Sequence, residues 1–165
     1  MVPSGPNAAS STEPTDRSQR FLVDAMFGTL VTYLRMCGYD TVYGPDIGVG
    51  ADDRLRQIAK WTDRTLLTRD RELAERTDGS IFVASTALDE QLRSIAAAGV
   101  DLTLPAEPQY CGRCNGHVTR FCGDSVPEYA PEDRRLWACE SCGQLFWKGS
   151  HWADVRDRLQ AIRKK

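Results

Sequence analysis

The sequence lacks the features of membrane-inserted and secreted proteins. No run approaches the roughly 18 apolar residues that a membrane span requires, and residues 1–20 lack the apolar stretch of a secretory signal. These absences exclude a membrane-spanning helix at the level of sequence. We expect a soluble, cytoplasmic protein that needs no membrane.

A strong charge of one sign is missing as well. The chain carries 21 Lys and Arg against 23 Asp and Glu, a net charge of -2. This excludes the broad electrostatic attraction of a typical basic nucleic-acid binder, so any such partner must be held locally or through metal. With 41% hydrophobic and 27% charged residues, both near globular averages, the 165 residues can bury one ordinary core and one small metal-held module.

Composition divides the chain into four segments. Residues 1–19 are rich in Ser, Pro and Thr with almost no large apolar side chain, which predicts a disordered tail. Residues 20–104 show aliphatic periodicity, residues 105–150 replace it with Cys, Gly and aromatic residues, and residues 151–165 return to helical spacing. We predict a main domain, a metal module and a final helix that packs back on the main domain.

Short apolar runs alternate with helical periodicity in the main domain. Strands are predicted over residues 21–23, 41–43, 65–68 and 81–84. Helices are predicted around residues 27–34, 55–59, 72–76 and 88–95. Gly38 is expected to form a left-handed helix cap, and residues 44–50 a loop. The alternation predicts an α/β fold with a parallel sheet.

Two CxxC motifs form the strongest local pattern. They comprise Cys111 and Cys114, then Cys139 and Cys142, with 24 residues between the pairs. Two such knuckles make a tetrahedral site for one zinc ion. Four thiolates leave no open position for water, so we predict a structural zinc and seek the chemistry elsewhere.

Cysteines at this spacing have other uses. Disulfide bonds are disfavoured in a reducing cytoplasm, whereas CxxC motifs also occur in thiol redox proteins. One tightly bound zinc per chain would remove the redox hypothesis. Cys37 and Cys122 lie outside the motifs and are predicted to be free thiols.

Acidic residues closely follow the predicted strands. Asp24 and Asp70 come after apolar runs, so a parallel sheet places them together at its carboxyl edge. Asp52 or Asp53, at a helix start, can supply a third carboxylate. Such ligands suit Mg2+ or Mn2+, which can activate water against a phosphodiester. Individually, Asp52 also suits a helix cap, Asp70 a turn and Asp53 a solvated charge.

The stretch Thr68-Arg69-Asp70-Arg71-Glu72 favours the metal hypothesis. It gathers a hydroxyl, two arginines and two carboxylates at the end of a buried strand, which suits a metal and a phosphate together. Arg69 and Arg71 are therefore candidates for binding the substrate backbone. Glu72 also suits the first turn of a helix, where the helix dipole favours an acid.

Four stretches together resemble the Mut-seven C-terminal ribonuclease domain family: Phe21–Leu30, Leu66–Leu73, the doubled CxxC and Trp147–Trp152. They occur in family order, and the resemblance covers about residues 20–160. It implies a PIN-like nuclease domain with a zinc ribbon. It also implies the reaction: clustered acids bind Mg2+ or Mn2+, and metal-activated water cleaves single-stranded RNA.

The resemblance also assigns the acids. Asp24 and Asp70 match the strand-end acids, and Asp52 matches the helix acid, with the adjacent Asp53 as the alternative. Asp89 is the nearest candidate for a fourth acid. Glu72 remains a further candidate.

A second hypothesis is a non-catalytic RNA-binding or protein-adaptor module that uses the zinc ribbon. Arg35 could then steer an RNA backbone or simply be a solvated charge. Tyr110 and the tryptophans could stack bases, but the core of a small zinc module is the favoured interpretation. His151 is expected to be structural, and His117 an outer contact of the zinc site.

Overall fold

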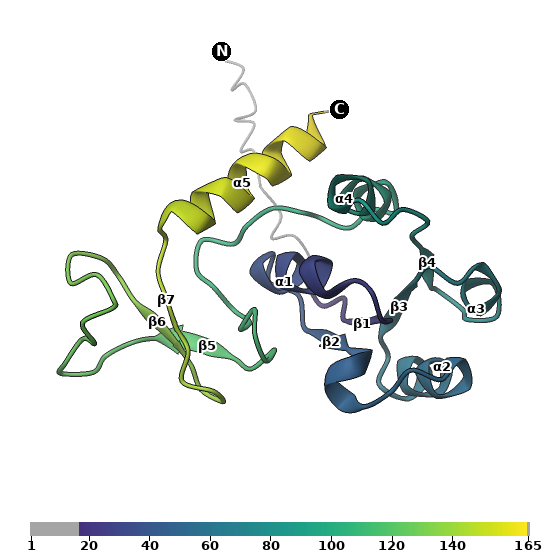
Figure 1. Ribbon diagram of the computed structural model, residues 1–165, viewed down its shortest axis with the longest axis horizontal. Helices are drawn as coiled ribbons and strands as arrows, with labels where there is room; N and C mark the ends of the chain where they lie inside the picture. Colours follow the sequence, from purple (N-terminus) through teal and green to yellow (C-terminus); the bar gives the residue numbers. More distant parts are fainter. Residues whose placement is uncertain (1–16, 165) are drawn as a thin grey trace, which may run out of the picture.

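A four-stranded parallel sheet organises the N-terminal half of the protein, whose computed structural model describes residues 17–164 (Figure 1). The strands are β1 (Phe21–Val23), β2 (Thr41–Tyr43), β3 (Thr65–Thr68) and β4 (Ile81–Phe82). Their order is β2-β1-β3-β4, and every neighbouring pair is parallel. The predicted α/β fold with a parallel sheet is confirmed.

Helices cover both faces of this sheet. They are α1 (Gly28–Met36), α2 (Asp52–Trp61), α3 (Arg71–Glu75), α4 (Leu88–Ala97) and α5 (Ser150–Arg163). Residues of β1 alternate between the faces: Phe21 and Val23 pack with α1, α4 and α5, whereas Leu22 packs with α2 and α3. Because both faces are buried, the strands are apolar runs rather than alternating ones.

The predicted loop at 44–50 contains a short 3-10 helix, η1 (Gly44–Ile47). Pro45 stands in its first turn, where a missing N–H costs nothing, and Gly48 ends it at a φ of 69°. The positive φ predicted for Gly38 after α1 is also present, at 88°. Strand β4 is shorter than predicted and ends at Phe82.

A second, smaller sheet lies beside α1, on the side of the molecule away from α2 and α3 (Figure 1). It consists of β5 (Val118–Arg120), β6 (Trp137–Cys139) and β7 (Leu145–Phe146), all antiparallel in the order β5-β6-β7. We call residues 110–146, which hold this sheet and both CxxC motifs, the cysteine ribbon. Trp137 is buried in its core.

Helix α5 returns to the main domain. Its buried residues Val155, Leu159 and Ile162 join the large core beneath α1 and α4. No helix among residues 17–164 is long and apolar enough to cross a membrane. Most of the predicted tail, residues 1–16, lies outside the described residues. Arg17, in the described part of the predicted tail, donates to the carbonyl of Thr103 at 3.0 Å. Contacts with the main domain therefore begin at this residue or before it.

Candidate functional site

Two predicted acids follow neighbouring strands at the carboxyl edge of the parallel sheet. Asp24 comes directly after β1, and its backbone N–H donates to the carbonyl of Leu67 at 3.0 Å. Asp70 lies two residues after β3. Since β1 and β3 are parallel neighbours, both acids are at the same edge, which is where ligands of open α/β folds bind.

The hydroxyl of Thr68 connects the two acids. It donates to Asp24 Oδ2 at 2.9 Å and accepts the backbone N–H of Asp70 at 3.0 Å. Thr68 is fully buried, so water cannot replace these partners. The other oxygen of Asp24 accepts the N–H of Ala25 at 2.7 Å. Both oxygens of the half-buried Asp24 carboxylate are therefore oriented by short hydrogen bonds.

Asp70 also caps α3. Its Oδ1 accepts the N–H of Leu73 at 2.9 Å, which satisfies one donor of the first helical turn. The alternative interpretation from the sequence was a turn residue, whereas the structure makes Asp70 the N-cap of a helix. This cap does not compete with a ligand, because it uses one oxygen and the exposed carboxylate has a second.

Asp52 is the first residue of α2. The prediction that it caps this helix is wrong: Ala51 is the N-cap residue, and no side chain caps the helix. The chain is already helical at Asp52, one position past the cap. Because α2 starts after the carboxyl end of β2 and returns to β3, its first turn lies toward the same sheet edge as Asp24 and Asp70.

Two further acidic candidates are neutralised by arginines. Asp53 lies 3.7 Å from Arg76 and 4.0 Å from Arg56, and Glu72 lies 3.5 Å from Arg76. These pairs are exposed and contribute little to stability. They nevertheless compensate the negative charge that a cation would otherwise meet.

Asp89 is likewise paired, with Arg158 of α5 at 3.4 Å. By contrast, no basic side chain of residues 17–164 lies within ion-pair distance of Asp24, Asp52 or Asp70. The three acids are still not gathered into a tight cage. In the described part of the chain, only the four cysteines bring three or more such ligand atoms within 4.8 Å of one another.

The two candidate substrate arginines are held differently. Arg71 stacks on the ring of Phe82, with 4.4 Å from its guanidinium carbon to the ring centroid. Arg69 is half-buried, and its Nε has no hydrogen-bond partner among the described residues. Both flank Asp70 in the sequence.

The four cysteine sulfurs form one cluster that fits a metal such as zinc. Sγ of Cys111 lies 3.7 Å from that of Cys142, and Sγ of Cys114 lies 3.5 Å from that of Cys139. Four sulfurs at the usual Zn–S distance of about 2.3 Å would be about 3.8 Å apart in a tetrahedron. The observed separations match this geometry and argue against two separate redox pairs, because each short contact joins one CxxC motif to the other.

Both knuckles have the same backbone geometry. The N–H of Asn115 donates to Cys111, and the N–H of Gly143 donates to Cys139. Burial raises the pKa of Cys111 to about 12. Burial also acts to raise the pKa of Cys139, but hydrogen bonds from the backbones of Cys142 and Ser141 and with the thiols of Cys114 and Cys142 together outweigh it and lower this pKa to about 7.

A family model for the Mut7-C RNAse domain matches residues 19–159, which include the carboxyl-edge acids and all four cysteines. The chain belongs to the Mut7-C RNAse domain family. The resemblance noted from the sequence motifs is confirmed, and it points to a ribonuclease-type function. Comparisons with curated proteins and with solved structures gave no match.

In this Mut7-C domain, Arg35 joins α1 to the cysteine ribbon. The prediction that it is solvated or contacts RNA is wrong, because it is only 3% exposed. Its guanidinium donates to the carbonyls of Thr41, Gly112 and Arg113 at 3.0 to 3.2 Å. Burial lowers the pKa of Arg35, and the neighbouring Asp46 opposes that shift.

Asn115 is a second link that the sequence analysis missed. Its φ is 64°, a conformation that Asn tolerates better than most residues. Its side chain accepts the N–H of Thr41 at 2.9 Å and donates to Asp40 at 2.7 Å. An Asn directly after a CxxC, in the place that Gly143 takes in the other knuckle, was the available signal.

Asp40 completes this junction. It forms an ion pair with Arg64 at 2.8 Å and accepts from Asn115. Burial acts to raise the pKa of Asp40, but its hydrogen bonds with Arg64 and Asn115 outweigh burial and lower it. The first knuckle of the Mut7-C domain is thus fixed to the edge strand β2 by polar contacts.

The aromatic residues divide into two groups. Trp137 is 3% exposed and belongs to the ribbon core, as favoured from the sequence. Tyr110, Trp147 and Trp152 are only half-buried and line a cleft, and Trp147 also packs against a ribbon core cluster. His117 packs against Tyr110 with ring centroids 5.2 Å apart and is not one of the four clustered metal-ligand residues.

Proposed function

We propose that this Mut7-C domain is a metal-dependent endoribonuclease that hydrolyses phosphodiester bonds in single-stranded RNA. One observation carries the proposal: Asp24 and Asp70 lie at one sheet edge, joined through a buried hydroxyl, without a basic partner among residues 17–164. Carboxylates arranged this way repel one another unless a cation lies between them.

Asp24, Asp52 and Asp70 are the residues that would hold Mg2+ or Mn2+. The oxygen donors suit these hard cations. When bound, the metal would supply an activated water and neutralise charge on the phosphodiester. The open geometry of the three carboxylates fits a cation that keeps several water ligands rather than one enclosed by protein.

The chain contributes orientation and charge. A hydrogen bond from Thr68 orients the Asp24 carboxylate, and the N-cap bond of α3 orients the Asp70 carboxylate. Both carboxylates are therefore oriented before a ligand binds. Arg69 and Arg71 flank Asp70 and are proposed to contact the RNA phosphates. Arg71 can do so while stacked on Phe82, because the stack uses the face of the guanidinium and leaves its edge.

The cysteine cluster is proposed to hold one structural zinc. Four thiolates saturate a tetrahedral ion, so this metal would support the fold and take no part in hydrolysis. Zinc and the divalent cation of the acids therefore have separate roles and can be removed separately.

Cleavage of labelled single-stranded RNA tests the proposal. Wild-type protein should cut in Mn2+ or Mg2+, and Asp24→Asn with Asp70→Asn should lose at least about a hundredfold in rate. Residues that merely orient metal ligands already cost about 10 to 100-fold when changed. Zinc content and circular dichroism should match those of wild type. No cutting by wild type at high protein concentration, across varied RNAs, would refute the nuclease proposal in favour of an RNA-binding or adaptor module.

A further inference from the structure

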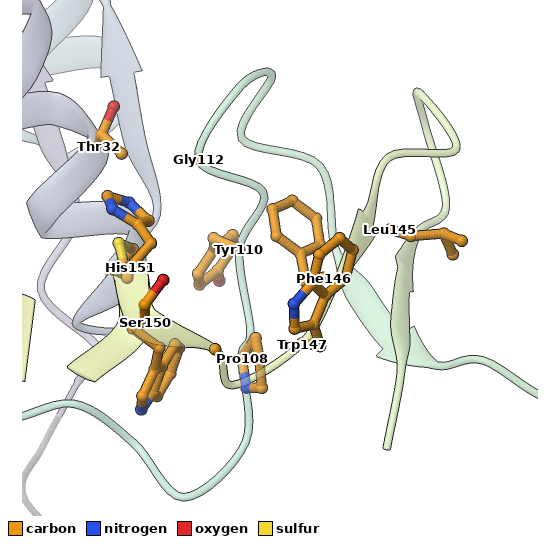
Figure 2. A pocket seen from close by; sticks show the side chains of 12 residues that line it. Thr32, Pro108, Tyr110, Gly112, Leu145, Phe146, Trp147, Ser150 and His151 are labelled. Carbon is orange, nitrogen blue, oxygen red and sulfur yellow. The ribbon is translucent and has the colours of Figure 1, made fainter. Parts of the chain in front are cut away.

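A cleft of about 300 Å3 opens between α1 and the cysteine ribbon (Figure 2). Rings from three separate parts of the chain face it: Tyr110 before the first knuckle, Phe146 and Trp147 at the end of β7, and His151 and Trp152 in the first turn of α5. Thr32 of α1 forms the opposite wall. None of the three described acids lines this cleft.

Packing of the ribbon accounts for only some of these rings: Phe146 and Trp147 pack against its core, whereas Tyr110 and Trp152 belong to no core cluster of the described residues. Trp137 already fills the ribbon core and is 3% exposed, whereas Tyr110, Trp147 and Trp152 keep part of their surface accessible. Buried aromatic rings stabilise a small module, but rings left around an open cleft provide flat apolar faces for a ligand. The cleft is large enough for one ring system and too small for a helix.

No carboxylate among residues 17–164 lines the cleft itself, and cations lie in the hollows beside it. One of these hollows, which shares Trp147 and Ser150 with the cleft, also holds Glu128 and Asp133. The ammonium of Lys148 lies 5.2 Å from the ring centroid of Trp152 and 5.8 Å from that of Trp137. His151, which lines the cleft, is exposed. Arg134 donates to the carbonyl of Lys148 at 2.8 Å, which brings a second cation to this border.

We propose that this cleft binds an unpaired base of single-stranded RNA, stacked between aromatic rings, with its phosphates near Lys148 and Arg134. The inference rests on the proposed function in taking RNA as the ligand. Every base has a flat face, so stacking here would be tolerant of sequence. It explains how a protein with net charge -2 can hold RNA: locally, through rings and a few cations.

The cleft and the acids share α1. Asp24 precedes the start of this helix at Gly28, and Thr32 on the cleft wall is one helical turn further on, about 5.4 Å along the axis. We therefore expect a single-stranded RNA that is anchored by one base in the cleft to reach the acidic edge within a few nucleotides. The cleft would then set which phosphodiester lies at the acids.

Binding is tested apart from cleavage. Fluorescence anisotropy of a labelled single-stranded RNA is measured with zinc-loaded full-length protein carrying Asp24→Asn and Asp70→Asn, without Mg2+ or Mn2+. Tyr110→Leu and Trp152→Leu are added to this background. Trp61→Leu is the matched control, because Trp61 lies on α2, outside the cleft, and is 77% exposed.

Each cleft variant should raise Kd about tenfold, and the control should leave it unchanged. A second measurement does not depend on the folding of the cleft variants. RNA containing 4-thiouridine is photocross-linked to the Asp24→Asn, Asp70→Asn protein with its cleft unchanged. Cross-links should map to Tyr110, Trp147 or Trp152. Kd values in both cleft variants equal to that of the parent protein, or cross-links only outside the cleft, would overturn the inference.

The two proposals fail separately. If wild type cuts RNA but the cleft variants bind as tightly as their parent, the cleft inference is wrong and the nuclease stands. If the cleft variants lose affinity but wild type cuts nothing, the cleft inference stands and the nuclease proposal is refuted.

Discussion

At the scale of residues, one buried hydroxyl governs how the acidic edge is presented. Thr68 serves Asp24 through its proton and Asp70 through its lone pair, so a single side chain sets the positions of two carboxyl-edge residues. The bond to Asp24 is charge-assisted and stronger than a neutral one. The arrangement can be disturbed without touching either acid.

Thr68→Val keeps the shape of the side chain and removes the hydroxyl. We expect the free energy of unfolding to fall by about 1–2 kcal/mol, because the Asp70 N–H and the Asp24 carboxylate lose a partner away from water. RNA cleavage should fall about 10 to 100-fold. Thr65→Val, at the amino end of the same strand, is the control. Denaturant unfolding and cleavage rates check both effects, and equal rates in the two variants would contradict this role of Thr68.

Adjacent Asp52 and Asp53 provide a second test at this scale. Asp53 is paired with arginines and Asp52 is not paired in the described structure, so only Asp52 should matter to a cation. We expect Asp52→Asn to raise the Mn2+ concentration needed for half-maximal cleavage about tenfold or more. Asp53→Asn should leave it unchanged. Titration of Mn2+ against the cleavage rate measures both, and the reverse result would move the helix acid to Asp53.

At the scale of elements, the first knuckle is joined to the edge strand of the parallel sheet. Asn115 accepts the N–H of Thr41, a group that an edge strand leaves without a ladder partner. The Arg35 guanidinium donates to the carbonyl of Thr41 in β2 and to the carbonyl of Gly112 in the first knuckle. The cysteine ribbon therefore covers this edge, and hydrogen bonds connect its first knuckle to the sheet.

Asn115→Gly should weaken this junction while keeping the positive φ accessible. We expect a loss of about 1–3 kcal/mol in the free energy of unfolding, because the N–H of the buried Thr41 is left unsatisfied. Gly143→Asn is the control, because Gly143 has the equivalent position in the other knuckle. A Cβ added at Gly143 would have no atom within 4 Å. Urea unfolding of the zinc-loaded proteins compares them, and a larger loss in the control would argue against the junction.

At the scale of the whole molecule, two metals would hold different parts of one chain. The cysteine ribbon has two small core clusters, one around the cysteines and Trp137 and one around Ala130, Leu136 and Leu145. Modules of this size usually need a metal to fold. The main domain has its own large core and shares it with α5.

Removing zinc should therefore unfold the ribbon before the sheet. We expect one zinc per chain by metal analysis, and a fall of about 10 °C or more in the Tm of the ribbon after chelation. Zinc release should increase as pH falls, because each cysteine binds zinc as the thiolate and protons compete with zinc for that sulfur. Cys139→Ser should lose zinc at neutral pH. A protein with full ribbon structure and no metal would contradict this account.

Local patterns in the sequence were sufficient for the α/β alternation, for the strands of the parallel sheet apart from the length of β4, for the grouping of the four cysteines and for the sheet edge of Asp24 and Asp70. These depend on short-range periodicity and on the fixed geometry of parallel sheets, which neighbouring residues determine. Only the tertiary structure decided that Arg35 is buried, that Asn115 holds the edge strand, that arginines pair with Asp53 and Asp89, and that aromatic rings distant in sequence surround one cleft. Those facts depend on contacts between segments up to about a hundred residues apart, and a sequence pattern carries no record of which distant groups meet.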